Sequence, residues 1–331
     1  MNFENKIILI TGGAGSFGQK FVEIILKEHN PKVVRIYDNR ELAEVEMERK
    51  LKDPRMRFLI GDVRDRSRLN RAMNGVDIVV HAAALKHVPV CEHDPLEAVK
   101  TNIKGTINVI DAAVDNIVEK AIIISTDKAV HPVNLYGATK MVAEKLFIQG
   151  NWYVGERRTI LSCARYGNVV GSSGSVVPLF LKQKKEGAVT ITDERMTRFW
   201  IDIEQGIRFV IKCIETMKGG EVFVPKIPSM KIMDLAEAIA PGVKKNFCGI
   251  RPGEKLHEVL ITKEEAVHTK EFKDYFVIEP EDPFRATINP LGGKPLPDDF
   301  EYTSKNNGSW ITKEQVREIL KNVKTEDLKI E

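Results

Sequence analysis

Short apolar runs recur along the first two thirds of the chain, and stretches with helical spacing separate them. The runs are rich in Ile and Val, which is typical of strands that are buried on both faces of a parallel sheet. They predict strands at residues 6–10, 33–37, 57–60, 77–81, 121–124, 159–165 and 221–224. Because strands alternate with helices, the sequence predicts an α/β fold with a doubly wound parallel sheet.

Helical patterns fill the intervals between these strands. One helix ends near Glu28, and a long helical segment extends over about residues 94–118. Further helices are predicted at residues 41–51, from about 134 onward, and at 203–217, 232–239 and 312–320.

The character of the chain changes after Tyr166. Residues 167–175 are rich in Gly and Ser and predict a loop, and residues 225–331 hold most of the later Pro and Gly. We interpret these segments as a smaller C-terminal domain at the edge of the sheet. Because the helix at 203–217 returns to the first domain, we expect an interleaved boundary. Residues 1–166 plus about 203–224 form one domain, and about 167–202 plus 225–331 form the other.

A glycine-rich turn joins the first strand to the first helix. Its glycines are spaced G-x-x-G-x-x-G, which permits a tight turn, close approach of a pyrophosphate and close helix packing. The N-terminus of the helix then faces the phosphates. In this strand–turn–helix context the turn predicts dinucleotide binding. The expected contacts are Gly12, Ala14, Gly15, Ser16, Phe17 and Gly18.

Two further strand ends belong to the same predicted site. Asp62 and Val63 follow the third strand, where they can contact an adenine. Ala82 and Ala83 follow the fourth strand and keep the side chains small where a cofactor must pass.

The end of the second strand bears on the choice between NAD and NADP. Asp38 lies about 20 residues beyond the glycines, at the position that holds the ribose hydroxyls of NAD. Asp38 would repel a 2′-phosphate, whereas Arg40 could clamp one, and Asn39 lies between them. Both cofactors therefore stay open, with a slight preference for NAD from the carboxylate.

Ionisable side chains gather after the fifth strand, where open α/β sheets bind ligands. Tyr136 and Lys140 are four residues apart and share a helix face. A neighbouring ammonium lowers the pKa of a phenol, so we expect Tyr136 to act as a base near neutral pH. With Thr126, which can bond the same hydroxyl, this set suits hydride removal from an alcohol carbon. Asp127 and Lys128 indicate a second chemical step.

Composition narrows the possible partners. The chain has 331 residues, of which 43% are hydrophobic, and 50 Lys and Arg against 47 Asp and Glu give a net charge of +3. This balance indicates no nucleic-acid or membrane partner. No apolar run approaches the roughly 18 residues of a membrane span. The N-terminus leads directly into a strand without a signal peptide, so we expect a cytoplasmic protein.

Neither the cysteines nor the histidines predict a metal site. Four cysteines are present without C-x-x-C or zinc-like spacing, which favours buried thiols in a reducing compartment. His81, His87 and His131 have no metal-ligand spacing, and we expect structural or supporting roles for them.

The motifs together resemble the inverting UDP-N-acetylglucosamine 4,6-dehydratases, which are extended short-chain dehydrogenase/reductases with a Rossmann domain. The resemblance covers essentially the whole chain, and its most specific part is Thr126-Asp127-Lys128. The matching segments are residues 82–89, 125–128, 165–171, 196–200, 251–258 and 299–302.

The resemblance implies a role for each residue after the fifth strand. Tyr136, with Thr126 and Lys140, would deprotonate the C4 hydroxyl while hydride passes from C4 to the nicotinamide. Lys128, which needs a depressed pKa, would remove the C5 proton, and Asp127, which needs a raised pKa, would protonate the departing C6 hydroxyl. Hydride return to C6 and reprotonation of C5 from the opposite face would invert C5. The dinucleotide would be recycled and stay bound.

The same resemblance implies that the first domain binds the dinucleotide and the second binds the UDP-sugar. Arginine forks suit a pyrophosphate, and a carboxylate suits sugar hydroxyls. The expected substrate contacts are Lys86, Asn168, Arg198, Arg251 and Glu254. Family members place Ser-Arg after the second strand and use NADP, whereas this chain has Asp38-Asn39, so the cofactor stays open. A homo-oligomer, a dimer or larger, is also implied.

Two other functions remain as alternatives. A nucleotide-sugar 4-epimerase shares Thr126, Tyr136 and Lys140 but does not need Asp127 and Lys128. A non-catalytic NAD(P)-binding sensor is the alternative of another class, and such a protein typically lacks the Tyr or the Lys.

Overall fold

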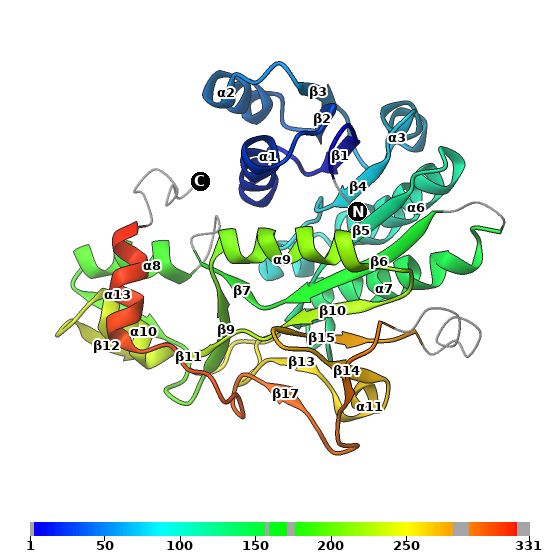
Figure 1. Cartoon of the computed structure of the whole chain (residues 1–331). Coiled ribbons are helices and arrows are strands. Elements are labelled where there is room, and N and C mark those ends of the chain that lie inside the picture. The colour runs from blue at the N-terminus through cyan, green and yellow to red at the C-terminus, as the bar shows by residue number, and fades with distance from the viewer. Residues whose placement is uncertain (1–2, 156–158, 171–175, 281–290, 323–331) are drawn as a thin grey trace.

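The computed structural model of the protein describes residues 3–155, 159–170, 176–280 and 291–322. Its main feature is a ten-stranded sheet in the order β16-β14-β15-β10-β6-β5-β4-β1-β2-β3 (Figure 1). The strands of this sheet are β1 (Ile7–Thr11), β2 (Val33–Asp38), β3 (Met56–Ile60), β4 (Ile78–His81), β5 (Lys120–Thr126), β6 (Ile160–Tyr166), β10 (Val222–Pro225), β14 (Thr269–Glu271), β15 (Tyr275–Ile278) and β16 (Lys294–Pro295).

The parallel part of the sheet confirms the predicted fold class. Strands β3, β2, β1, β4, β5, β6 and β10 pair in parallel, and each matches a predicted apolar run. Central strands such as β4 are buried along their whole length, which is why they have no polar alternation. The antiparallel strands β15, β14 and β16 extend the sheet with residues that the sequence assigned to the smaller domain.

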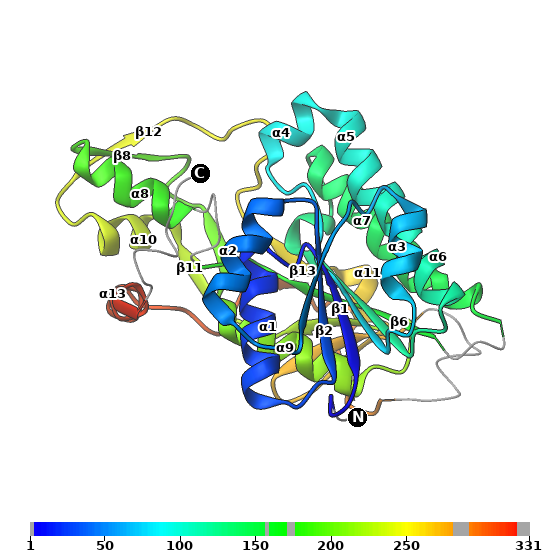
Figure 2. The ribbon, with the colours of Figure 1, turned by 90° about the horizontal axis from the view of Figure 1, so that it is seen from above.

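Helices cover both faces of the sheet (Figure 2). One side carries α1 (Ser16–Glu28), α2 (Glu41–Leu51) and α9 (Ile203–Thr216), and the other carries α3 (Arg66–Met73), α6 (Gly105–Asp115) and α7 (Leu135–Gln149). Helix α3 was not predicted, because its sequence is mostly polar. Its start is fixed by Asp65, which accepts a hydrogen bond from the Arg68 amide at 2.9 Å.

The predicted long helical segment at about 94–118 is confirmed as a continuous helical stretch from residue 95 to residue 115. It contains α5 (Pro95–Val99), a π-helical turn η1 (Lys100–Lys104) that was not predicted, and α6, and it follows the short helix α4 (Val88–His93). At the π-helical turn the buried Asn102 side chain bonds both the N–H and the C=O of Leu85. This side chain joins the helix to the loop after β4, and a π-turn is where such an insertion is accommodated.

A second, smaller hydrophobic core lies beside the sheet and includes Phe180, Trp200, Met230 and Leu235. In Figures 1 and 2 its helices and strands form a separate group beyond the C-terminal ends of the parallel strands. They are β7 (Asn168–Val169), α8 (Val176–Lys185), β8 (Ala188–Ile191), β9 (Thr197–Ile201), β11 (Ser229–Lys231), α10 (Ile232–Ile239), β12 (Lys244–Phe247) and α13 (Lys313–Asn322).

A short ladder links this group to the main sheet. It pairs β13 (Val259–Ile261) with β17 (Tyr302–Thr303), next to α11 (Lys263–Ala266). Within the predicted loop at 167–175, residues 168 and 169 form strand β7, and residues 171–175 lie outside the described residues. The predicted domain limits also include residues 1–2, 156–158, 281–290 and 323–331, which the structure does not describe. Among the described residues, no helix combines the length and the apolar character needed to cross a membrane.

Candidate active site

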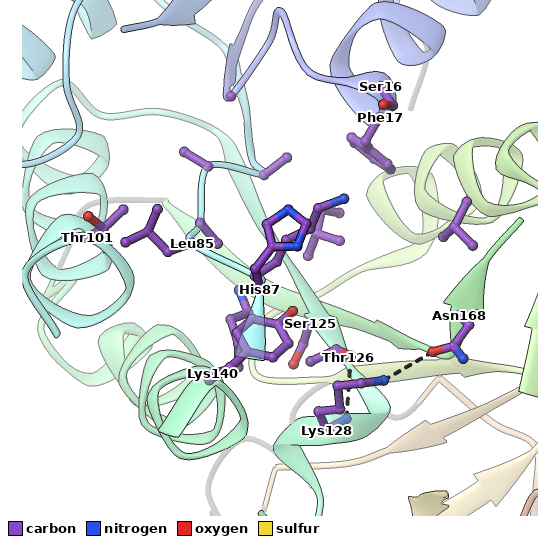
Figure 3. A pocket seen from close by; sticks show the side chains of 18 of the residues that line it. Ser16, Phe17, Leu85, His87, Thr101, Ser125, Thr126, Lys128, Lys140 and Asn168 are labelled. Carbon is purple, nitrogen blue, oxygen red and sulfur yellow. Dashed lines mark hydrogen bonds between the residues drawn. The ribbon is translucent and has the colours of Figure 1, made fainter. Parts of the chain in front are cut away.

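One cavity of about 880 Å³ extends along the C-terminal ends of the parallel strands and reaches the smaller core. Figure 3 shows Ser16 and Phe17 at one side of it and Lys128, Thr126 and Asn168 at another. The predicted residues that line it are Gly12, Ser16, Phe17, Asp38, Asn39, Arg40, Asp62, Val63, Ala82, Ala83, Lys86, Thr126, Lys128, Tyr136, Lys140, Asn168 and Arg198. The structure therefore brings the predicted cofactor residues and most of the predicted reactive residues to one space.

The glycine turn after β1 fits a dinucleotide. Gly12 has a φ of +66°, and a Cβ there would lie 2.9 Å from the backbone of Ala83, so no larger residue fits. Gly15 is the N-cap of the 13-residue helix α1, and no side chain caps the helix. The backbone amides at this N-terminus suit phosphate oxygens.

Three of the predicted turn residues support the cavity without lining it. They are Ala14, Gly15 and Gly18. A Cβ at Gly18 would lie 2.3 Å from the carbonyl oxygen of Gly13, so Gly18 allows the helix to pack on the turn as predicted. Ala14 donates its N–H to Asp38 Oδ2 at 3.0 Å.

Asp38 does not present free carboxylate oxygens to the cavity. Arg40 donates to it from the backbone amide, from Nε at 3.0 Å and from Nη2 at 3.1 Å, in addition to the Ala14 bond. Asp38 is buried, whereas the side chain of Arg40 is about half exposed. The pair therefore presents a guanidinium, oriented by a buried carboxylate, at the end of the cavity next to β2.

The reactive residues after β5 are held by the start of α7. Asn134 is the N-cap of α7 and accepts a hydrogen bond from the Gly137 amide at 2.7 Å. A Cβ at Gly137 would lie only 2.2 Å from the carbonyl oxygen of Lys128. The helix that carries Tyr136 therefore packs directly on η2 (Asp127–Ala129), the 3-10 turn that carries Lys128.

The electrostatic prediction for Tyr136 is wrong. Burial raises the pKa of Tyr136 to about 12, and the cation that opposes this rise is Lys128 rather than Lys140. Burial also lowers the pKa of Lys140 to about 8, which weakens Lys140 as a source of positive charge. Desolvation of the phenol thus outweighs the helical spacing that motivated the prediction.

Lys128 lies between three polar partners. Its Nζ is 3.0 Å from Asp127 Oδ1, 3.1 Å from Asn168 Oδ1 and 3.7 Å from Glu258 Oε1. The two carboxylates outweigh the desolvation of the ammonium and raise the pKa of Lys128. The prediction of a depressed pKa for Lys128 is therefore wrong. Two carboxylates lie near its ammonium, and only one of them, Asp127, is a neighbour in the sequence; the other, Glu258, is distant in the chain.

Asp127 is fully buried behind the cavity wall. Burial and the charge of Glu258 raise its pKa, while Lys128 and a hydrogen bond from Thr126 lower it, and the net direction is upward. The raised pKa that its predicted role needs is confirmed. Asp127 Oδ2 has no hydrogen-bond partner, and Asp127 does not itself line the cavity.

The predicted substrate contacts divide into two groups. Lys86, Asn168 and Arg198 line the cavity, whereas Arg251 and Glu254 do not. Arg251 is exposed in a turn whose Gly253 carbonyl accepts a hydrogen bond from Asn134 at 2.8 Å.

The guanidinium of Arg198 is largely occupied by the protein itself. Its Nη1 donates to Thr197 O and Leu256 O, and its Nη2 donates to Lys255 O. Arg198 therefore holds the 255–258 segment in place while one side of it faces the cavity.

Several residues at the site were not predicted. Glu258 and Lys255 lie beside Lys128 although they are distant in the sequence, and only the 251–258 motif pointed to them. His87 lines the cavity and projects into it in Figure 3, which is more than the supporting role expected of it. His81 is buried between Thr11 and Thr106, both within hydrogen-bond distance, so its structural role is confirmed.

A doubly wound sheet, a glycine turn at β1 and a Tyr136–Lys140 pair at the sheet edge define an extended short-chain dehydrogenase/reductase. The chain belongs to the family described as "Polysaccharide biosynthesis protein", whose model matches residues 8–280.

Two relatives and one solved structure illustrate the similarity. The chain is 50% identical over 327 residues to "UDP-N-acetylglucosamine 4,6-dehydratase (inverting)" of Campylobacter jejuni, covering 96% of this chain and 98% of the relative. It is 40% identical to "UDP-glucose 4-epimerase" of Rickettsia conorii, covering 96% of each chain. The X-ray structure of Pen from Bacillus thuringiensis superposes with a TM-score of 0.89 at 37% identity, covering 98% of this chain and 99% of that one.

Proposed function

We propose that the protein is an inverting UDP-N-acetylglucosamine 4,6-dehydratase, a hydro-lyase that removes water across C5 and C6 of the sugar. The observation that carries the proposal is the contact of Lys128 with Asp127 at the wall of the cavity that Tyr136 and Lys140 also line. The 50% identity to a dehydratase of that name supports the same reaction. The product is UDP-2-acetamido-2,6-dideoxy-β-L-arabino-hex-4-ulose.

The dinucleotide site fits through the Gly12 turn and the uncapped N-terminus of α1. A bound oxidised nicotinamide dinucleotide supplies the hydride acceptor and donor, together with a positively charged ring that lowers the pKa of a neighbouring phenol. Tyr136 takes the proton of the C4 hydroxyl, and Thr126 holds that hydroxyl. Lys140 lies on the same helix, lines the cavity and would bind the dinucleotide.

Elimination needs a base at C5 and an acid at the C6 hydroxyl, and a single proton transfer within the Lys128–Asp127 contact produces both. Transfer of a proton from Lys128 Nζ to Asp127 Oδ1 across 3.0 Å gives a neutral amine and a carboxylic acid. The amine, which lines the cavity, removes the C5 proton. The acid lies behind the cavity wall and supplies its proton through the Thr126 hydroxyl, 3.0 Å from Asp127 Oδ1, to the C6 hydroxyl, which leaves as water. The pair is then again an ammonium and a carboxylate. Return of the hydride to C6 would be accompanied by addition of a solvent proton to C5 from the opposite face, which inverts that centre.

We propose NADP as the dinucleotide, with NAD as the alternative. The carboxylate of Asp38 accepts hydrogen bonds from Arg40 and from the Ala14 amide. Its negative charge is therefore neutralised by Arg40 and would repel a 2′-phosphate less. The half-exposed Arg40 guanidinium would hold that phosphate, and a bidentate guanidinium–phosphate contact is strong.

The remaining features concern the substrate and the assembly. Lys86, Asn168 and Arg198 are the proposed UDP-sugar contacts at the cavity, and Arg251 and Glu254 reach it only if their turn moves. We expect a homo-oligomer in the cytoplasm, acting in the synthesis of a pseudaminic-acid-type sugar. Exposed apolar side chains on neighbouring helices, such as Leu96 and Val99 of α5 and Met141 of α7, support an interface there.

The decisive experiment is mass spectrometry of the product formed from UDP-N-acetylglucosamine in deuterated water. We expect loss of one water and incorporation of solvent deuterium at C5. Lys128→Ala should abolish dehydration while dinucleotide binding persists, and Lys182→Ala on α8 is a control that leaves dehydration unchanged. Dehydration by Lys128→Ala at the wild-type rate would contradict the assigned role.

The 40% identity to a 4-epimerase makes that activity the second candidate. An epimerase leaves the mass of the sugar unchanged in ordinary water, so the same experiment separates the two. A bound dinucleotide with no turnover of any UDP-hexosamine would instead indicate a sensor.

A further inference from the structure

Glu258 is a buried carboxylate between three cations next to the reactive pair. Its exposed fraction is 2%. Its oxygens lie 3.7 Å from Lys128 Nζ, 3.7 Å from Arg198 Nε and 3.6 Å from Lys255 Nζ. Glu258 does not line the cavity, so it acts on the substrate only through its neighbours.

The backbone of Glu258 is fixed on both sides by one residue. The Glu258 amide donates to Ser304 Oγ at 2.9 Å, and the Ser304 amide donates to Glu258 O at 2.8 Å. Ser304 Oγ is also 2.7 Å from Thr197 Oγ1, next to Arg198 on β9. The backbone that carries the carboxylate is therefore tied to Ser304 and, through it, to β9.

The geometry around Glu258 differs from that of a buried ion pair built for stability. Arg165 donates to Glu265 at 2.8 and 2.9 Å and to Glu144 Oε2 at 3.2 Å, as a stabilising pair requires. The carboxylate of Glu258 instead lies 3.6–3.7 Å from all three cations, which is longer than a hydrogen bond. Its Oε2 has no hydrogen-bond partner. It therefore acts mainly through its charge.

We propose that Glu258 is a further positioning residue of this site, whose negative charge holds Lys128 as an ammonium ion and keeps the proton on the Lys128–Asp127 pair. Its catalytic meaning depends on the proposed dehydration. Three charged groups face the Lys128–Asp127 pair: Arg198 from β9, and Lys255 and Glu258 from the segment before β13. The phenol of Tyr136 on α7 also lies near the pair.

The directions of the pKa values agree with this geometry. The charge of Glu258 raises the pKa of both Asp127 and Lys128. The three cations hold the pKa of Glu258 itself below its usual value, against the effect of its burial. Glu258 is thus the group that stays ionised while the pair exchanges its proton.

The test compares Glu258→Gln with the wild type by two measurements. The first is the rate at which acetic anhydride acetylates Lys128 at pH 9, followed by peptide mass spectrometry, which needs no substrate. Because loss of the Glu258 charge lowers the pKa of Lys128, we expect acetylation to be roughly 10- to 1000-fold faster. The second is the pH profile of dehydration, whose limbs should move toward acid by roughly one to three pH units.

Two further variants separate this effect from damage to the fold. Lys255→Met removes a cation beside Glu258 and should slow the acetylation of Lys128, which is the opposite direction. Glu221→Gln alters another buried carboxylate, which bonds Ser162 and the Gly219 amide and lies elsewhere in the sheet. It should lower the melting temperature without changing either readout.

Unchanged acetylation in both Glu258→Gln and Lys255→Met would overturn the inference. If Glu258→Gln does not fold, the Lys255→Met result decides alone. Failure of the wild type to dehydrate UDP-N-acetylglucosamine would overturn the proposed function, while the acetylation experiment would still decide the role of Glu258.

Discussion

Arg40 closes over Asp38 with two side-chain hydrogen bonds, from Nε to Oδ1 at 3.0 Å and from Nη2 to Oδ2 at 3.1 Å. An acid at the end of the second strand ordinarily selects NAD, because it binds the ribose hydroxyls and repels a 2′-phosphate. Here the acid is buried and compensated, and the arginine that it orients is the exposed member of the pair.

Arg40→Met should therefore change the cofactor preference. Loss of a charge-assisted contact costs roughly 1.5–3 kcal/mol, so the Kd of NADP should rise about 10- to 100-fold relative to that of NAD. Isothermal titration calorimetry with both cofactors measures the ratio. Arg64→Met is the control, since Arg64 also lines the cavity but pairs with Asp62 and Glu97. An unchanged ratio of the two affinities in Arg40→Met would contradict the assignment of NADP.

Gly137→Ala should inactivate the enzyme without unfolding it. The added Cβ would meet the Lys128 carbonyl at 2.2 Å, so the turn that carries Asp127 and Lys128 must shift. A displacement of about 1 Å costs on the order of 100-fold in rate. We expect kcat to fall by that factor with an unchanged far-ultraviolet circular dichroism spectrum.

The matched control for this substitution is Gly206→Ala in α9. A Cβ at Gly206 has its nearest neighbour, Ile201 Cδ1, at 3.8 Å, so the methyl group is accommodated. Alanine is the better helix former, and this variant should keep its activity and its stability. Wild-type kcat in Gly137→Ala would show that the close contact does not position Lys128.

Arg165→Met should destabilise the fold strongly. Arg165 is buried on β6 and bridges Glu144 of α7 and Glu265 of α11, so its loss leaves Glu144 buried without its cation. Breaking a buried ion pair in this way costs about 3–5 kcal/mol. Urea unfolding monitored by fluorescence measures the loss. Arg195→Met removes an exposed partner of Asp193 and should leave the urea midpoint nearly unchanged, because exposed ion pairs contribute little to stability.

Glu44→Gln should stabilise the protein above neutral pH. Burial and the charge of Asp38 raise the pKa of Glu44 from an ordinary 4.5 to about 7, and Glu44 Oε1 has no hydrogen-bond partner. A carboxyl with a raised pKa favours the folded state while it is protonated. This stability is lost as the pH rises from 4.5 through 7, at about 1.4 kcal/mol per pH unit.

The variant should therefore gain roughly 2–3 kcal/mol over the wild type at pH 8 and nothing at pH 4. Thermal denaturation at the two pH values measures the difference. Glu46→Gln, at an exposed position of the same helix α2, should show no gain at either pH. Equal gains of Glu44→Gln at both pH values would rule out titration as the cause.

Much of the fold and the dinucleotide site follows from local patterns in the sequence. The apolar runs predict the parallel strands because strands buried on both faces tolerate few polar residues. The Gly12 turn and the spacing of Tyr136 and Lys140 are equally local, since a strand end followed by a helix fixes both. Strands β14 and β15 could not be predicted in this way, because both are short. Strand β15 joins the sheet by pairing with β10, which is distant in the sequence, and β14 then pairs with β15.

Local sequence patterns were enough to predict the parallel part of the sheet, the glycine turn and the candidate reactive residues Thr126, Asp127, Lys128, Tyr136 and Lys140. The charge states of these residues depend on the folded structure. The fold half-buries Tyr136 in the cavity wall, places Glu258 beside Lys128 and closes Arg40 over Asp38. The reason is physical: a pKa depends on burial and on every charge within a few ångströms, and folding brings those charges from segments that are far apart in the chain.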